Sequence, residues 1–236
     1  QNLMKLTSIF FLKNEEEKNN VNLDEIKKYN SGLICLSGGP SGLIGNLFLR
    51  NKIEKANDIC KWFKKIFNDR FYIELQRHPK NENRNLDIEN ITEPFFLELA
   101  YKYNISIVAT NDVYFKDNSM YEAHDALICV AEGVYVDQTS NRRRLTPHHY
   151  FKSSKEMCDL FEDLPEACEN TIIISKRCTV KAELKDPILP KFADNEEDEL
   201  KIQSTSGLKK RLLSIPLASE ERNYWSRLEY ELKIIK

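Results

Sequence analysis

The sequence predicts an α/β fold in which parallel strands are joined by helices, and three neighbouring segments carry this prediction. Residues 71–76 and 105–110 are runs rich in β-branched and aromatic residues, as expected of buried strands. Residues 88–103, which lie between them, have the pattern of a helix. Two largely apolar strands bridged by a helix are typical of a βαβ unit with parallel strands. Functional groups collect at the carboxyl ends of such strands, so we expect a site there.

The composition of the 236-residue chain is that of an ordinary globular protein, with 41% hydrophobic and 31% charged residues. Its 7 glycines are fewer than the roughly 16 that average usage would give, which argues against several phosphate-binding glycine loops. The net charge of −2 gives the whole chain no electrostatic footprint for nucleic acid, although a local basic surface stays compatible with it. No apolar run reaches the roughly 18 residues of a membrane span, so we expect no membrane partner.

The six cysteines are spread along the chain without a CxxC pair, which disfavours zinc-ribbon and thioredoxin-like sites. Four of them lie inside apolar runs: Cys35, Cys60, Cys129 and Cys158. Free cysteine is among the residues most often buried, and disulfides are rare in the cytosol. We therefore expect reduced, buried thiols in a cytoplasmic protein.

The first third of the chain is expected to contain a strand, a glycine-rich turn and three helices, one of which begins near Ser41. Residues 23–29 predict a short helix capped by Asn22, and residues 53–67 predict an amphipathic helix. Residues 33–37 predict a buried strand that runs into Gly38-Gly39-Pro40-Ser41-Gly42. This turn could cradle a phosphate, or it could be a tight connection between a strand and a helix. It lacks the P-loop lysine and the spacing of a dinucleotide fingerprint.

The second half of the chain is expected to be mainly helical. Residues 134–138 read as a weak strand or extended piece, and residues 186–192 must be extended because their two prolines exclude a helix. The change from alternating strands and helices to helices alone predicts a domain boundary near residue 180. Helices are expected at residues 120–130, 154–161, 165–178, 200–213 and 220–236.

Five titratable residues are candidates for a site. Asp112 follows a buried strand, and a buried carboxylate must be paired, bound to metal or protonated, so we expect a cation or backbone N–H groups to hold it. His78, at the other strand end, could be a metal ligand, a general acid or a hydrogen-bonded structural residue. His124 is expected to be structural, and His148 and His149 lack the spacing of a helical metal pair. No catalytic triad and no carboxylate set for two Mg²⁺ ions can be argued.

Three adjacent arginines, Arg142, Arg143 and Arg144, form a dense basic run. Arginine guanidinium groups bind phosphates well, so this run could contact nucleic acid. The alternative is a solvated loop without a partner.

Seven short motifs occur in a specific order over nearly the whole chain. They are residues 32–38, 71–77, 108–113, 124–127, 156–161, 174–178 and 189–192. In this order they resemble the family of bacterial DNA polymerase III alpha subunits, which are C-family replicative polymerases.

The resemblance implies a fold and a division of the chain. Residues 1–180 would be the later part of the polymerase and histidinol phosphatase (PHP) domain, a partial, distorted (β/α)₇ barrel. Residues 181–236 would be helices leading into the polymerase palm. The chain is expected to be an internal piece, since it begins without methionine at Gln1 and stops inside a helical pattern at Lys236. The family's catalytic carboxylates would then follow it, and its histidine-rich metal motifs would precede it.

The resemblance also places a metal site and shows how this chain departs from it. Metal-binding members have a cysteine ligand where this chain has Gly39, and an Asp-x-His motif where it has Asp112-Val113-Tyr114. Only Asp112 keeps a ligand-type side chain, and tyrosine is a poor replacement for imidazole in such clusters. We therefore expect a degenerate site with no catalytic residue in this segment.

The implied function of the full-length protein is DNA-directed DNA synthesis with Mg²⁺, primer–template DNA and dNTPs. The implied partners are the proofreading exonuclease subunit, the sliding clamp and the clamp loader. This segment would be a non-catalytic scaffold and docking domain, without bound metal and without polymerase activity of its own. An active metal-dependent PHP phosphoesterase or proofreading exonuclease is the alternative, and a general metabolic α/β enzyme is a third reading.

Overall fold

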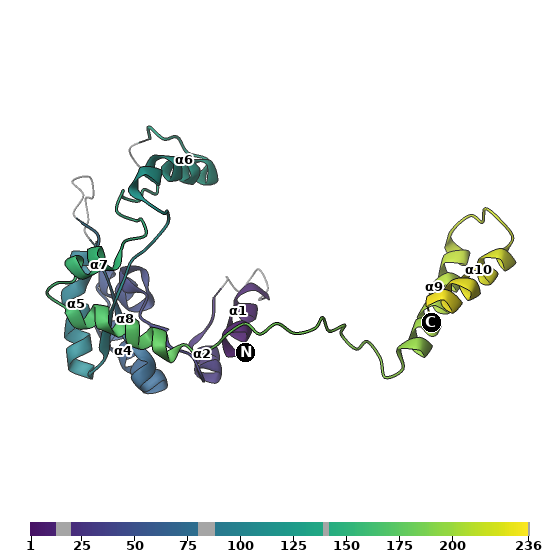
Figure 1. Cartoon of the computed structure of the whole chain (residues 1–236), viewed down its shortest axis with the longest axis horizontal. Helices are drawn as coiled ribbons and strands as arrows, with labels where there is room; N and C mark the ends of the chain where they lie inside the picture. Colours follow the sequence, from purple (N-terminus) through teal and green to yellow (C-terminus); the bar gives the residue numbers. More distant parts are fainter. Residues whose placement is uncertain (13–19, 80–87, 139–141, 236) are drawn as a thin grey trace. The chain divides into compact units, whose positions relative to one another are not determined.

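The computed structural model describes residues 1–12, 20–79, 88–138 and 142–235 (Figure 1). The chain forms two compact units, Gln1–Thr179 and Val180–Lys236. Within the described residues, no helix combines the length and apolar character needed to cross a bilayer.

The first unit is built on a parallel sheet with the strand order β1-β2-β3. The described strands are β1 (Cys35–Leu36), β2 (Phe71–Gln76) and β3 (Ser106–Thr110). Helix α5 (Ile88–Tyr103) lies between β2 and β3 in sequence, so the predicted βαβ unit is confirmed. Its register sets Tyr72 opposite Ser106 and Gln76 opposite Thr110, which brings the carboxyl ends of the two strands together.

Two strand predictions were wrong in detail. The strand expected at residues 33–37 is only the two-residue β1, and it is not buried, because Leu36 keeps 38% of its surface exposed. Residues 134–138 form a turn, not a strand or extended piece. This turn follows Gly133, whose φ of 66° ends the preceding helix in the left-handed region.

Most helices of the first unit match the predicted segments to within a few residues, but the helix at Asn2–Leu12 was not predicted. The predicted cap at Asn22 is confirmed, and Ser153 caps the helix that follows it in the same way: each accepts the N–H of a glutamate that returns a hydrogen bond. Besides α5 they are α1 (Asn2–Leu12), α2 (Leu23–Tyr29), α3 (Leu43–Leu49), α4 (Ile53–Phe67), α6 (Tyr121–Glu132), α7 (Ser154–Leu160) and α8 (Pro165–Arg177). Short 3₁₀ turns lie at Gly39–Ser41 (η1), Asn68–Arg70 (η2) and Asn118–Met120 (η3).

The main core of the first unit lies between the sheet and the helices that contact it. Helix α8 packs on β3, while α4 and α5 contact β2 (Figure 1). Ile73 and Leu75 of β2 are fully buried against Leu99 of α5 and Phe161. On the apolar face of α4, Ala56, Cys60 and Phe67 are buried, and Ile59 and Phe63 are half-buried. Ile53 lies in the first turn and stays 45% exposed.

A second, smaller cluster lies beyond β3. Phe115, Ile128 and Leu145 are buried together, with Tyr121 and Tyr150 packed against them. Phe115 pairs with Tyr150 in an isolated parallel bridge, which ties the segment after β3 to the segment before α7.

The second unit contains α9 (Glu196–Ser214) and α10 (Glu221–Ile235), which contact each other. Asn195 caps α9 by accepting the N–H of Asp198, and four acidic residues occupy the first turn of the helix. Residues 186–192 contain no helix or strand, as their two prolines predict.

The glycine-rich turn after β1 is a tight strand-to-helix connection. Gly38 and Gly39 have φ values of 83° and 55°, which favour glycine. Gly45 of α3 packs directly on this turn, and a Cβ atom there would lie 2.4 Å from the carbonyl oxygen of Pro40. The backbone of the turn must therefore move if residue 45 gains a side chain.

Replacing Gly45 with alanine is expected to destabilise the first unit by about 1–3 kcal/mol, since the new methyl group overpacks the turn. The matched control is Gly207→Ala in α9, where no atom lies within 4 Å of the added Cβ. That change should leave the stability of the first unit unaltered. Urea denaturation followed by tryptophan fluorescence and circular dichroism measures both, and equal stability of Gly45→Ala and wild type would contradict the packing argument.

Candidate functional site

The candidate site lies at the carboxyl ends of the three strands, and its centre is a carboxylate that sequence reasoning missed. Glu74 of β2 accepts the backbone N–H of Gly38 at 3.0 Å and the hydroxyl of Thr110 at 2.6 Å. The amide of Gln76 donates to it at 3.4 Å. Glu74 is the only acidic residue in the apolar run of residues 71–76, and this pattern could have identified it from the sequence. Its donors come from the ends of all three strands, so it ties the site together.

The space beside Gly39, where the resemblance places a cysteine ligand, is filled by a neighbouring side chain. A Cβ atom on Gly39 would lie 2.9 Å from both Cδ and Oε1 of Gln76. The positive φ of Gly39 adds strain to any side chain placed there. A cysteine at residue 39 would thus require Gln76 to leave its position.

Asp112 lies just beyond β3 and is half-buried. Within the described ranges, no hydrogen bond or ion pair reaches its carboxylate. The predicted backbone N–H contacts to Asp112 are therefore not found there.

Tyr114, at the position where the resemblance places a histidine ligand, is held by an arginine. Arg143 donates from Nη2 to the Tyr114 hydroxyl at 2.7 Å, and its guanidinium carbon lies 5.2 Å from the ring centroid. The Tyr114 ring also faces the rings of His124 and His149, with centroids 5.6 Å and 6.0 Å away. A guanidinium at this point repels a cation, so Tyr114 does not replace a metal-binding imidazole.

Two of the histidines stack on each other. The rings of His78 and His149 are nearly parallel, with centroids 4.0 Å apart. Glu89 accepts the backbone N–H of His78 at 2.9 Å, and its carboxylate lies 2.8 Å from His78 Nδ1. His78 is therefore hydrogen-bonded, as one of its two alternatives predicted. Its Nε2 and the Nδ1 of His124 are buried with no hydrogen-bond partner in the part of the chain that the structure describes.

A buried lysine adds positive charge beside these rings. Lys152 is 7% exposed and donates from Nζ to Asn111 Oδ1 at 3.4 Å and to the carbonyl oxygen of His148. Burial lowers the pKa of Lys152. Burial likewise lowers the pKa of His148, and the nearby charges of Lys152 and His78 lower it further.

The arginine run divides into one buried and two exposed residues. Arg142 forms a bidentate ion pair with Asp125, with both distances at 2.7 Å, and its side chain is 1% exposed. This hydrogen-bonded pair lowers the pKa of Asp125. Arg143 and Arg144 are exposed, and Arg144 donates to the carbonyl oxygen of Val136. Only these two remain accessible to a phosphate.

The residues at the strand ends do not fit the metal cluster that the resemblance places there. Gly39 has no side chain that could bind a metal, and Gln76 fills the space beside it. The Tyr114 hydroxyl already accepts a hydrogen bond from Arg143. Among the residues with a described position, no group of three or more histidine, cysteine, aspartate or glutamate side chains is arranged to hold a metal ion. The side chains form a network of neutral and charged hydrogen bonds. This network supports no metal-dependent step.

Comparison of the sequence with known protein families places the first part of the chain in a domain class. The PHP domain family matches residues 1–78, in agreement with the parallel α/β architecture of the first unit.

Comparison with individual proteins shows which proteins the chain is similar to. DNA polymerase III subunit alpha of Caulobacter vibrioides is 43% identical over 240 residues, which cover the whole chain. The corresponding subunits of Rickettsia bellii and Escherichia coli K12 are 38% and 34% identical, over 100% and 91% of this chain. The chain spans about a fifth of the length of these curated relatives. The resemblance to DNA polymerase III alpha subunits is confirmed.

The depressed pKa of His148 predicts a pH-dependent stability. Its folded-state pKa lies below the ordinary value of 6.5, so the unfolded chain binds the proton more readily. Stability should therefore fall as the pH drops through 6.5 towards the folded pKa. His148→Gln is expected to flatten this dependence in urea denaturation series. As a second readout, Lys152→Gln should raise the pKa of His148 in an NMR titration, because a facing positive charge is removed. An unchanged pKa would contradict the contact between these charges.

Proposed function

We propose that this chain is a non-catalytic scaffold and docking segment of the alpha subunit of a bacterial replicative DNA polymerase. One observation carries the proposal: both lost ligand positions are taken by other contacts, Gln76 at Gly39 and Arg143 at Tyr114. The printed names of the relatives supply the polymerase context.

The proposed domain assignment follows the two compact units. Residues 1–180 are assigned to the later part of a PHP domain, a partial (β/α)₇ barrel, and residues 181–236 to helices that lead into the polymerase palm. The PHP family match over residues 1–78 and the parallel sheet support the first assignment. The two-helix unit supports a separate element after residue 180.

The full-length protein is proposed to be a DNA-directed DNA polymerase that uses primer–template DNA, dNTPs and Mg²⁺ in the cytoplasm. Its proposed partners are the proofreading exonuclease subunit, the sliding clamp and the clamp loader. Within this segment the proposed role of the strand-end residues is structural. Glu74 joins the three strand ends, and Arg143 fixes Tyr114 against His124 and His149.

An active metal-dependent phosphoesterase is the second candidate function. It is favoured by the buried, unpartnered Nε2 of His78 and Nδ1 of His124, because imidazole nitrogens are common metal ligands. The half-buried Asp112 could complete such a set with donors from elsewhere in the protein.

Removing the remaining ligand-type side chain separates these two functions. In the full-length protein, Asp112→Asn is expected to leave primer extension within about twofold of wild type, since the scaffold reading gives its charge no catalytic role. Inductively coupled plasma mass spectrometry of the purified protein should find less than one Zn or Mn per chain, with no release of phosphate from a phosphomonoester. Stoichiometric metal that is lost in Asp112→Asn, together with phosphoesterase activity, would establish the second function instead.

The exposed pair of arginines is proposed to contact the DNA backbone. In the full-length protein, Arg143→Glu/Arg144→Glu should weaken binding to primer–template DNA and reduce the salt dependence of log K by about one for each lost phosphate contact. The control is Lys27→Glu/Lys28→Glu, an equal charge reversal on two exposed residues of α2. Binding isotherms by fluorescence anisotropy at several salt concentrations measure both. Equal weakening in the two variants would show a general charge effect and no role for the arginine loop.

A further inference from the structure

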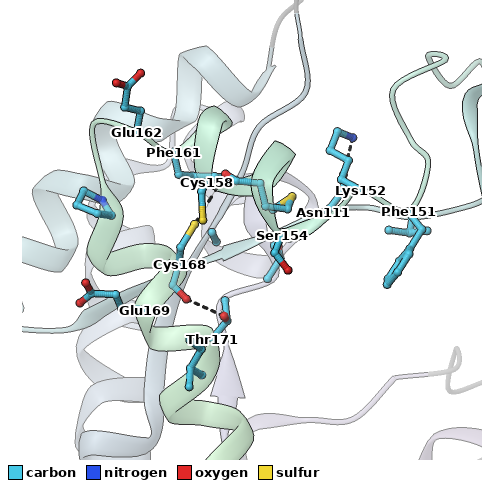
Figure 2. Close-up of a pocket in the computed structure, with 16 residues that line it drawn as sticks. Asn111, Phe151, Lys152, Ser154, Cys158, Phe161, Glu162, Cys168, Glu169 and Thr171 are labelled. Carbon is cyan, nitrogen blue, oxygen red and sulfur yellow. Dashed lines mark hydrogen bonds between the residues drawn. The ribbon is translucent and has the colours of Figure 1, made fainter.

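A pocket of about 600 Å³ lies beside the strand ends, between β3, α7 and α8 (Figure 2). Asn111 and Lys152 line one part of it, and Cys158 and Cys168 line another. The proposed function gives these two cysteines no role.

The two cysteines lie on the two helices that form a wall of the pocket. Cys158 belongs to α7 and is exposed, whereas Cys168 belongs to α8 and is half-buried. The thiol of Cys168 lies 3.8 Å from the carbonyl oxygen of Met157, the residue that precedes Cys158. Figure 2 shows the two side chains pointing toward one another from facing helices.

The connection between the helices holds this arrangement in place. Phe161 is fully buried, and its carbonyl oxygen accepts the N–H of Leu164 at 2.9 Å. Cysteines whose Cα atoms lie within about 7 Å can be bridged without backbone movement. The short, anchored turn and the 3.8 Å contact place the Cys168 thiol beside the backbone of the residue that precedes Cys158, which favours this pairing.

We propose that Cys158 and Cys168 are a modification site at which a reversible disulfide joins α7 to α8 across the pocket. The pKa of Cys168 is raised, chiefly by burial and then by the neighbouring Cys158, so less of its thiol is in the reactive thiolate form. The exposed Cys158 is the residue that meets an oxidant.

The oxidant is a small disulfide such as oxidised glutathione. The Cys158 thiolate attacks it, forming a mixed disulfide and releasing one glutathione thiolate. Cys168 then loses its proton to solvent and attacks the Cys158 sulfur, which releases the second glutathione thiolate and forms the Cys158–Cys168 bond. Two thiols are oxidised and one glutathione disulfide is reduced. The bond joins the two helices that line this side of the pocket.

The test uses the whole 236-residue chain, equilibrated in buffers of reduced and oxidised glutathione, acid-quenched and then alkylated after denaturation. Trypsin releases residues 156–176 as one peptide, which contains both cysteines and no other. The expected result is loss of both alkylation sites and a mass lower by two hydrogen atoms. Cleavage after Glu162 and Glu166 should then leave residues 156–162 and 167–176 joined until the disulfide is reduced.

Three variants make the result specific. Cys158→Ser and Cys168→Ser should each abolish the linked peptide, with circular dichroism confirming that the variants are folded. Cys178→Ser removes the other exposed cysteine and should leave the linkage unchanged. Full alkylation of both cysteines at every glutathione ratio would overturn the proposal. Disulfides found only between two chains, or only with Cys178, would overturn it as well.

Discussion

The pairing of β2 with both of its neighbours is the constraint on which the first unit depends. Its hydrogen bonds to β1 and β3 set the parallel register, and that register brings three strand ends to one edge. At this edge, Glu74 of β2 accepts a hydrogen bond from a donor at the end of each strand. A carboxylate in such a half-buried place is costly unless it is hydrogen-bonded, so the same contacts that satisfy Glu74 also hold the strand ends together.

This edge lies at the carboxyl ends of the strands, where functional groups of parallel sheets collect. Its side chains are nevertheless hydrogen-bonded to one another. At this edge, Gln76 lies against Gly39 and a guanidinium lies against Tyr114. Arg142 nearby is likewise committed to Asp125. These guanidinium groups place positive charge near the strand ends, which would repel a bound cation, and this supports the proposed scaffold role.

Several of these contacts join residues far apart in the chain, which is why the sequence did not reveal them. Arg143 lies 29 positions from Tyr114, and Glu74 lies 36 positions from both Gly38 and Thr110. Periodicity and capping patterns report neighbours within one element and carry no information about such pairs. Asp112 was chosen because it follows a strand, yet the polar network formed around Glu74 instead. Cys158 was expected to be buried from its apolar neighbours, but it lies on the exposed side of a two-turn helix.

The sequence by itself determined the α/β class, the βαβ unit, most helix bounds with their caps, the extended segment at residues 186–192 and the relationship to DNA polymerase III alpha subunits. These features depend on local pattern, turn chemistry and ordered motifs, all of which are written along the chain. Tertiary structure alone decided that β1 is short, that Glu74 is the centre of the strand-end network and that Arg142 is unavailable to a partner while Arg143 is bound to Tyr114. The physical reason is that burial and charge pairing are set by which distant elements pack together.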